Sequence, residues 1–141
     1  MNTFLTWLSL NGVSQVFLSG LSAAFLSWLL NGRLLNVYKN KAVIYIGPVV
    51  EEASKTGMAV FTGAPVFLTH TVFGMLEAVW EVGSYRRGTA AGMAALATHA
   101  TYGLITHYLM ELYGVFFAMA MAVIIHVIWN YWIMHKTVSR Q

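Results

Sequence analysis

The sequence predicts an all-α protein, a polytopic membrane helical bundle of about five transmembrane helices. Hydrophobic residues make up 58% of the 141 positions and charged residues only 9%, which is too little polar surface for a soluble domain of this size. The hydrophobic residues also fall into successive stretches, each near or above the ~20 residues that cross a bilayer, with very short connections between them. Four of the five carboxylates nevertheless lie inside these stretches, where ionisable groups are costly and mark functional sites: Glu51, Glu52, Glu77 and Glu81.

The first predicted span covers about 3–30. It lacks an N-terminal basic region and is longer than the core of a secretion signal, so we interpret it as a retained helix. Its serines, together with Asn11, Gly12 and Gln15, predict packing against other helices through small and polar residues. The other four spans are expected at about 42–61, 64–82, 88–111 and 113–135.

The second of these five spans contains an interruption. Gly47 and Pro48 fall inside it and are followed at once by two carboxylates. Because proline is favoured in a first helical turn, Pro48 is expected to start a new helix after a broken or re-entrant entry. Irregular backbone at membrane depth is tolerated only beside protein or water, so the break itself points to a polar interior.

The basic residues predict the orientation of the bundle. They occur in the first connection, in the third connection and after the last span: Arg33, Lys39, Lys41, Arg86, Arg87, Lys136 and Arg140. The second and fourth connections carry none, so we expect an integral protein of the cell membrane with its N-terminus outside and its C-terminus in the cytoplasm. The basic residues form no continuous face, so no nucleic-acid partner is expected and the lipid bilayer is the predicted environment. The absence of cysteine excludes disulfides, thiolate metal sites and a cysteine nucleophile.

Four predicted helices place polar groups in the same half of the bilayer. Counting ~1.5 Å per residue from the cytoplasmic ends puts Glu51 and Glu52 at ~15 Å, His99 at ~16 Å and His126 at ~14 Å. Glu77 and Asn130 fall at ~8 Å. Residues four apart share a helical face, which pairs Glu51 with Lys55, Phe73 with Glu77, and His126 with Asn130. We expect these groups to converge on one polar cavity, with His70 a weaker candidate on the stripe of Glu77 and Glu81 a bystander near the cytoplasmic face.

Such a set suits hydrolysis inside a membrane. The reaction needs a base to deprotonate water, a donor for the oxyanion and an acid for the departing amine, and glutamate, histidine and asparagine supply these roles. Adjacent carboxyls in a low dielectric are hard to ionise together, so one can act as the base while its neighbour stays protonated. Lys55 on the face of Glu51 favours Glu51 as the charged member, although the roles of Glu51 and Glu52 can be reversed.

Four motifs in order resemble those of the PrsW family of intramembrane proteases, within the CAAX-protease and bacteriocin-processing superfamily. Residues 48–55, PVVEEASK, resemble P-x-x-E-E-x-x-K, and residues 73–77, FGMLE, match F-x-x-x-E. Residues 99–103, HATYG, are similar to the third motif, a histidine followed by glycine, and residues 126–130, HVIWN, to H-x-x-x-N. The resemblance covers about 47–132. Ala78 stands where the family usually has asparagine, and the chain is short, which describes a minimal or degenerate member or one completed by an oligomer or a partner subunit.

The resemblance implies a glutamate-dependent endopeptidase that cuts a membrane-embedded protein or peptide. Glu51 or Glu52 would activate water, and His99 and His126 would stabilise the oxyanion or move the proton. Asn130 would support His126 or the oxyanion, and Glu77 would orient the group opposite it. On this interpretation residues 1–141 form a single transmembrane domain, with helix 3–30 accessory and 42–135 a four-helix catalytic core.

Other chemistries remain open at the level of sequence. No cofactor is expected, but a zinc ion could be held by Glu52, His99 and His126, although no H-E-x-x-H spacing occurs. A proton- or ion-coupled transporter or channel would also use intramembrane glutamate, histidine and lysine. A haem-binding membrane protein could use His70, His99 and His126 as axial ligands.

Overall fold

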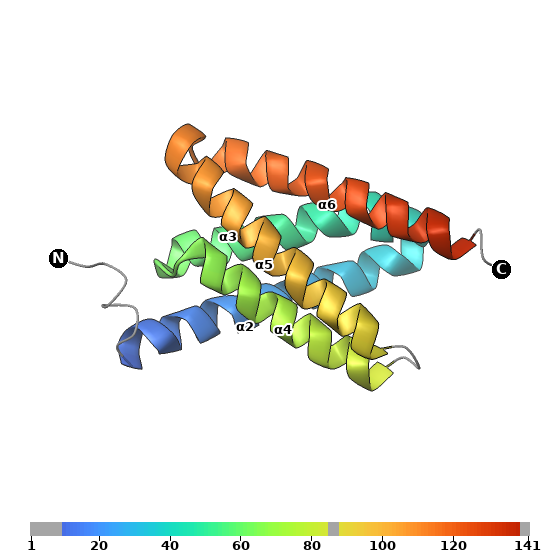
Figure 1. Cartoon of the computed structure of the whole chain (residues 1–141), viewed down its shortest axis with the longest axis horizontal. Coiled ribbons are helices and arrows are strands. Elements are labelled where there is room, and N and C mark those ends of the chain that lie inside the picture. The colour runs from blue at the N-terminus through green and yellow to red at the C-terminus, as the bar shows by residue number, and fades with distance from the viewer. Residues whose placement is uncertain (1–9, 85–87, 139–141) are drawn as a thin grey trace.

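The computed structural model describes residues 10–84 and 88–138, and within them every element is a helix. The α-helices are α2 (Leu10–Tyr38), α3 (Gly47–Thr62), α4 (Val66–Ser84), α5 (Gly88–Tyr113) and α6 (Val115–Val138). A π-helix, η1 (Ala42–Ile46), runs directly into α3. Successive helices alternate in direction, so the start of α2 and the end of α6 lie at opposite ends of the bundle (Figure 1). The all-α prediction is confirmed for the described residues.

The helix boundaries follow the predicted spans with one clear difference. The first helix does not end near Leu30 but continues to Tyr38. A turn at Lys39, which has a positive φ of 48°, then leads into the second span. The start of the first predicted span, and Arg86, Arg87 and Arg140 of the predicted orientation signal, lie outside the described residues.

The interruption predicted at Gly47 and Pro48 is present as a change of helix type. The Gly47 N–H donates to the carbonyl of Ala42, the i to i+5 pattern of a π-helix. Pro48 then lies in the first turn of α3, where a missing N–H is tolerated. The second span therefore passes from π- to α-helix without a loop between the two. Single π-helical turns of this kind occur often at functional sites.

Glycines let α4 and α5 pack closely along their length. A Cβ built on Gly74 would lie 2.8 Å from the His99 Cβ, and one on Gly103 would lie 2.7 Å from the His70 Cβ. α2 packs against α4 in the same way, since Gly20 faces Val72 and the Thr69 hydroxyl donates to Ser19 at 3.1 Å. The predicted packing of the first helix through small and polar residues is confirmed for Gly12, Ser19 and Ser27, which are buried, but not for Gln15, which is exposed. Because lipid offers no hydrophobic drive between helices, small residues of this kind suit a bundle in a membrane.

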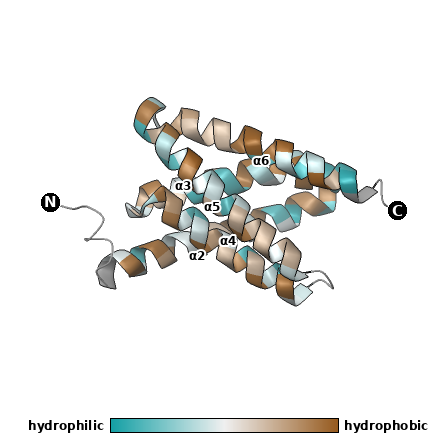
Figure 2. Cartoon of the chain, in the orientation of Figure 1, coloured by the Kyte–Doolittle hydropathy of each residue, from teal (hydrophilic) through white to brown (hydrophobic). Residues whose placement is uncertain are grey.

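Within residues 10–84 and 88–138, two helices are long and apolar enough to cross a membrane. These segments are Gly12–Tyr38 in α2 and Val115–Lys136 in α6, and only 28% and 17% of their apolar windows are buried inside the protein. A core helix of a soluble protein would instead be mostly buried. Large apolar side chains such as Phe25, Phe61 and Phe116 are exposed on the outer surface, at 63%, 84% and 80%. In Figure 2 hydrophobic colours cover much of α6, and hydrophilic colours appear towards its C-terminal end.

Candidate functional site

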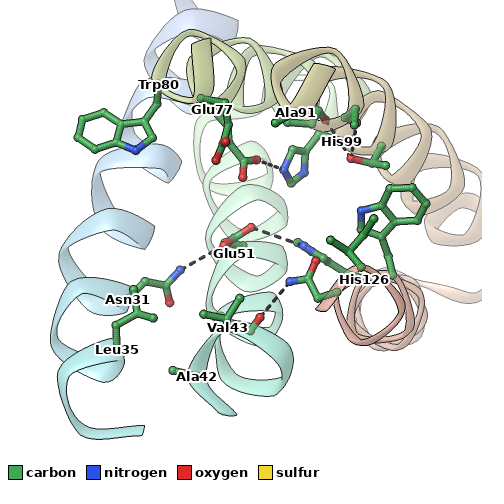
Figure 3. Close-up of a pocket in the computed structure, with 18 residues that line it drawn as sticks. Asn31, Leu35, Ala42, Val43, Glu51, Glu77, Trp80, Ala91, His99 and His126 are labelled. Atoms are coloured by element: carbon green, nitrogen blue, oxygen red, sulfur yellow. Dashed lines mark hydrogen bonds and ion pairs between the residues drawn. The ribbon is translucent and has the colours of Figure 1, made fainter. Parts of the chain in front are cut away.

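A cavity of about 530 Å³ opens at the end of the bundle where α2 finishes, α3 begins and α6 finishes. Five of the six predicted site residues line it: Glu51, Glu77, His99, His126 and Asn130. Each comes from the helix on which the sequence placed it, and Figure 3 shows that the two carboxylates and the imidazoles point toward one another. The cavity also takes Asn31 and Leu35 from α2, so the first helix contributes to the site and is not simply accessory. Glu52, the sixth predicted residue, does not line it.

Glu51 is the carboxylate of the adjacent pair that faces the cavity. Its side chain keeps 19% of its surface exposed. Oε1 accepts a hydrogen bond from Asn31 Nδ2 at 3.2 Å, and Oε2 lies 3.9 Å from His126 Nε2 (Figure 3). The second distance is too long for a direct hydrogen bond. Glu51 Oε2 and His126 Nε2 therefore each leave a lone pair open to the same part of the cavity.

Glu52 is fully buried beneath this wall. Its Oε1 accepts from Lys55 Nζ at 2.6 Å and from His126 Nδ1 at 2.8 Å. Its Oε2 lies 3.7 Å from His70 Nδ1, and the other ring nitrogen of His70 lies 3.4 Å from the Thr56 hydroxyl. We call Glu52, Lys55, Thr56 and His70 the buried cluster. The exposed fraction of each of these residues is at most 1%.

Because of their shared helical face, Lys55 is expected to favour Glu51 as the charged carboxylate of the pair. The structure pairs Lys55 with Glu52 instead. Lys55 binds Glu52, three residues before it, and turns away from the cavity. Positions three and four apart are both neighbours on a helix, so spacing alone does not choose between the two glutamates. The choice is made by α4 and α5, because Phe73 and His99 surround the ammonium on the side of Glu52. Lys55 Nζ lies 4.7 Å above the Phe73 ring and 2.9 Å from His99 Nδ1.

The contacts of Lys55 and Glu52 set the tautomers of two histidines. An ammonium only donates, so His99 Nδ1 must accept from Lys55, which leaves the proton of neutral His99 on Nε2. That nitrogen donates to Glu77 Oε2 at short range. An ionised carboxylate only accepts, so His126 Nδ1 carries the proton toward Glu52 and its Nε2 is the acceptor that faces Glu51. His99 therefore acts as a donor through Nε2, whereas His126 offers its Nε2 as an acceptor.

Asn130 binds the backbone of η1 rather than His126. Its Nδ2 donates to the carbonyl of Val43 at 2.9 Å. In the π pattern this carbonyl would accept from the N–H of residue 48, which Pro48 does not have. Asn130 thus satisfies an acceptor that the proline leaves open and ties α6 to the start of α3. The predicted support of His126 by Asn130 takes no direct form, although Asn130 lines the same cavity as His126.

Sequence reasoning missed or underrated three residues. Asn31 lies beyond the predicted end of the first span, and its position four after Ser27 on one helical face was the available signal. His70 is predicted to be only a weak candidate for the site, yet its Nδ1 lies 3.7 Å from Glu52 Oε2. Tyr102, buried three positions after His99, has its ring 5.2 Å from His126 and 6.1 Å from His99.

Glu81 is expected to be a bystander near the cytoplasmic face. It lies one helical turn after Glu77 and is among the residues that line the cavity.

The zinc set predicted from the sequence does not fit the arrangement. His99 and His126 turn one nitrogen each to Lys55 and Glu52, and the ammonium itself lies between Glu52 and His99. Within residues 10–84 and 88–138, no three acidic or histidine side chains form a group that could hold a metal ion. A cation already occupies the centre of the proposed ligands. No step of the chemistry below therefore runs through a metal.

A haem set fits no better. The His99 and His126 rings are 5.6 Å apart in an edge-on contact, and Tyr102 packs against both. This packing leaves no slot between the imidazoles for a planar macrocycle.

The comparisons with known proteins add no relative to these observations. No family model matches the chain, and neither the curated proteins nor the solved structures yield a match.

Proposed function

We propose that the protein is an intramembrane glutamate-dependent endopeptidase of the PrsW type that cleaves a membrane-embedded protein or peptide. The observation that carries the proposal is the meeting of Glu51 and His126 at 3.9 Å on the wall of a cavity that also takes in His99, Glu77 and Asn130. A base, a proton acceptor and an amide donor within one hydrated space are the groups that peptide hydrolysis needs.

In this mechanism Glu51 is the base. Its Oε2 takes a proton from a water molecule, and the water oxygen forms a bond to the scissile carbonyl carbon. The free amide hydrogen of Asn130 donates to the oxyanion that develops. When the C–N bond breaks, Glu51 returns the proton to the departing amine, so the carboxylate is regenerated at the end of the cycle.

His126 and Glu52 hold the geometry of that step. Glu52 accepts from His126 Nδ1 and so keeps Nε2 directed to the region of Glu51. His126 Nε2 then accepts the second hydrogen of the water and orients its lone pair. Glu77 accepts from His99 Nε2 on the opposite wall, and Lys55 donates to His99 Nδ1, so both nitrogens of His99 are occupied and this residue holds the wall in place. On this proposal Glu52 is a positioning residue and Glu51 the catalytic one, which divides the two roles left open by the sequence.

The proposal includes five membrane crossings with the cavity in the cytoplasmic half. The cavity lies at the end of the bundle where α6 finishes, and the predicted orientation places the C-terminus in the cytoplasm. Among the described helices, α2 and α6 contain the two segments that are long and apolar enough to cross a membrane. Their exposed apolar side chains are suited to lipid, and the cell membrane is the proposed location.

The test uses the purified protein in proteoliposomes with a library of single-span reporter peptides, whose products are identified by mass spectrometry. We expect at least one reporter to be cut, and Glu51→Gln to lower the rate by about 10²–10⁴ because the base is removed. Glu111→Gln, an exposed carboxylate at the other end of the bundle, is the matched control and should cleave at the wild-type rate. Cleavage by Glu51→Gln at the wild-type rate would show that Glu51 is not the base.

A proton-conducting function is the second candidate, favoured by a different observation. Hydrogen bonds connect Glu77, His99, Lys55, Glu52 and His126 in one unbroken chain from α4 through α3 to α6. Such a relay can pass protons between ionisable groups inside a membrane. The same proteoliposomes loaded with a pH-sensitive dye decide the point. Proton flux that Lys55→Met abolishes, without cleavage of any reporter, would replace the protease by a proton carrier.

A further inference from the structure

The first helix sends one polar side chain into the cavity, and that side chain binds the proposed base. Asn31 and Leu35 are the α2 residues among those that line the cavity. Asn31 Nδ2 donates to Glu51 Oε1 at 3.2 Å, across twenty positions of sequence. Because the bond holds Oε1, it fixes the rotation of the carboxylate and leaves Oε2 directed to His126. Figure 3 shows Asn31 reaching toward Glu51 from the opposite side to His126.

The amide of Asn31 lies beside the first residue of α3. A Cβ built on Gly47 would be in ordinary van der Waals contact with it, 3.8 Å from its Nδ2 and 3.9 Å from its Oδ1. Its Oδ1 is buried and makes no hydrogen bond within the described residues. The side chain therefore holds a spare acceptor beside the donor that Glu51 uses.

A general base alternates between two chemical forms, and an amide can pair with both. The ionised carboxylate needs a donor, which Asn31 Nδ2 supplies. In the protonated carboxyl the proton is on Oε2, and Oε1 becomes the carbonyl oxygen, which still accepts from Asn31 Nδ2. A hydroxyl at position 31 would be too short to reach, and an aliphatic side chain could serve neither form. Asparagine at this place matches the change of state that catalysis by Glu51 demands.

We propose that Asn31 is a positioning residue for Glu51 that stays hydrogen-bonded to it in both its ionised and its protonated form. The inference rests on the proposed function, since it assigns a partner to the base of that mechanism. It also makes α2 part of the catalytic unit, because the hydrogen bond that orients the Glu51 carboxylate comes from this helix.

The test follows the infrared carbonyl band of protonated Glu51, obtained as the difference between wild type and Glu51→Gln in nanodiscs over a series of pH values. Asn31→Leu should shift this band to higher wavenumber, because Oε1, the carbonyl oxygen of the acid, loses its donor. Asn31→Gln should restore the wild-type position, since it keeps both amide groups. Asn36→Leu, the same exchange at an exposed position of α2, should leave the band unchanged. Asn31→Ala replaces Asn31→Leu if the larger side chain prevents folding.

Kinetics with a cleaved reporter supply the second readout. Asn31→Leu should lower kcat about tenfold with KM unchanged, the effect of losing one hydrogen bond to a charged group. If Asn31→Leu changes neither the position of the band nor kcat, the inference is overturned, but the proposed protease function still stands. The absence of any Glu51 band across the pH series would overturn it too, since the carboxyl would then never carry the proton. Loss of the proposed function itself has a separate outcome, namely cleavage by Glu51→Gln at the wild-type rate.

Discussion

Glu51 and Glu52 are neighbours in sequence, but they belong to two different regions of the molecule. Glu51 lies in the cavity wall, partly exposed, with an asparagine and a histidine imidazole around it. Glu52 lies in the buried cluster with no exposed surface, between a lysine ammonium and two histidines. Successive residues point about 100° apart on a helix, so one step along α3 separates a group that can meet a substrate from one that cannot. An intramembrane carboxylate can thus take part in the reaction, or it can position the residues that do.

The comparison also separates two ways of carrying charge in a low dielectric. The buried cluster solves the problem by pairing, since every charge in it has a partner of opposite sign within hydrogen-bond distance. The cavity wall solves it with polar contacts and access to water. Substitutions in the buried cluster should therefore act on stability, and substitutions of the wall on activity.

The largest effect on stability is expected at the Glu52 and Lys55 pair. Glu52→Ala should cost about 3–5 kcal/mol of unfolding free energy, because it leaves Lys55 buried without a counter-ion. Lys55→Met should cost a similar amount for the opposite reason. The double variant Glu52→Gln with Lys55→Met should cost less than either, since no unpaired charge remains. Denaturant titration in mixed micelles measures these values, with Glu51→Gln as the control from the cavity wall. Equal losses for Glu51→Gln and Glu52→Ala would remove the distinction between the regions.

A smaller loss is expected where α4 meets α5. Gly74→Ala places a methyl group 2.8 Å from the His99 Cβ and forces the two helices apart, which should cost about 1–3 kcal/mol. The displacement also carries His99 away from Glu77 and Lys55, so the cavity wall should lose activity along with stability. Gly57→Ala is the control, because nothing lies within 4 Å of its Cβ position, and alanine there should stabilise α3 by up to about 1 kcal/mol. A harmless Gly74→Ala would mean that the wall does not depend on this close approach.

A third effect concerns the link between Asn130 and the π-helix. Asn130→Leu leaves the Val43 carbonyl without its donor, at an expected cost of about 1 kcal/mol because the position is partly exposed. The same variant should slow cleavage more than it lowers stability, since it also removes the proposed oxyanion donor. Parallel titration and rate measurements with Asn36→Leu as the matched control check both parts. A stability loss without a rate loss would assign Asn130 to the backbone alone.

Much of the fold could be predicted because it follows from hydrophobic runs and their punctuation. The helix ends near Val66, Gly88 and Val115 fall where short polar or glycine-containing connections interrupt the apolar sequence. The break at Gly47 and Pro48 was predictable from the chemistry of proline. The end of the first helix was not, because residues 31–38 are more polar and continue the helix without being apolar enough to count as a span.

The site could be predicted in its members but not in its pairings. Depth counting brought Glu51, His99 and His126 to one level and Glu77 to the same half of the bilayer, and all four line the cavity. Which glutamate binds Lys55 depends on the surroundings that α4 and α5 provide, and these appear only once the helices are packed. The partner of Asn31 was out of reach for the same reason, since the polar face that it shares with Ser27 does not indicate that α2 crosses α3 at Glu51.

The smallest effect is expected at the end of the bundle opposite the cavity, where His107 and Glu111 form an exposed i to i+4 pair at 3.5 Å. Glu111→Gln should change the unfolding free energy by less than about 0.5 kcal/mol, because water screens both groups. The titration used for Glu52→Ala measures this variant too, at low and high salt. A loss above about 1 kcal/mol would show that this end is shielded from water in the membrane. Charged groups would then fall into three classes and not two. Besides buried pairs and solvated groups, there would be ion pairs that the isolated chain exposes but that lipid or another subunit covers.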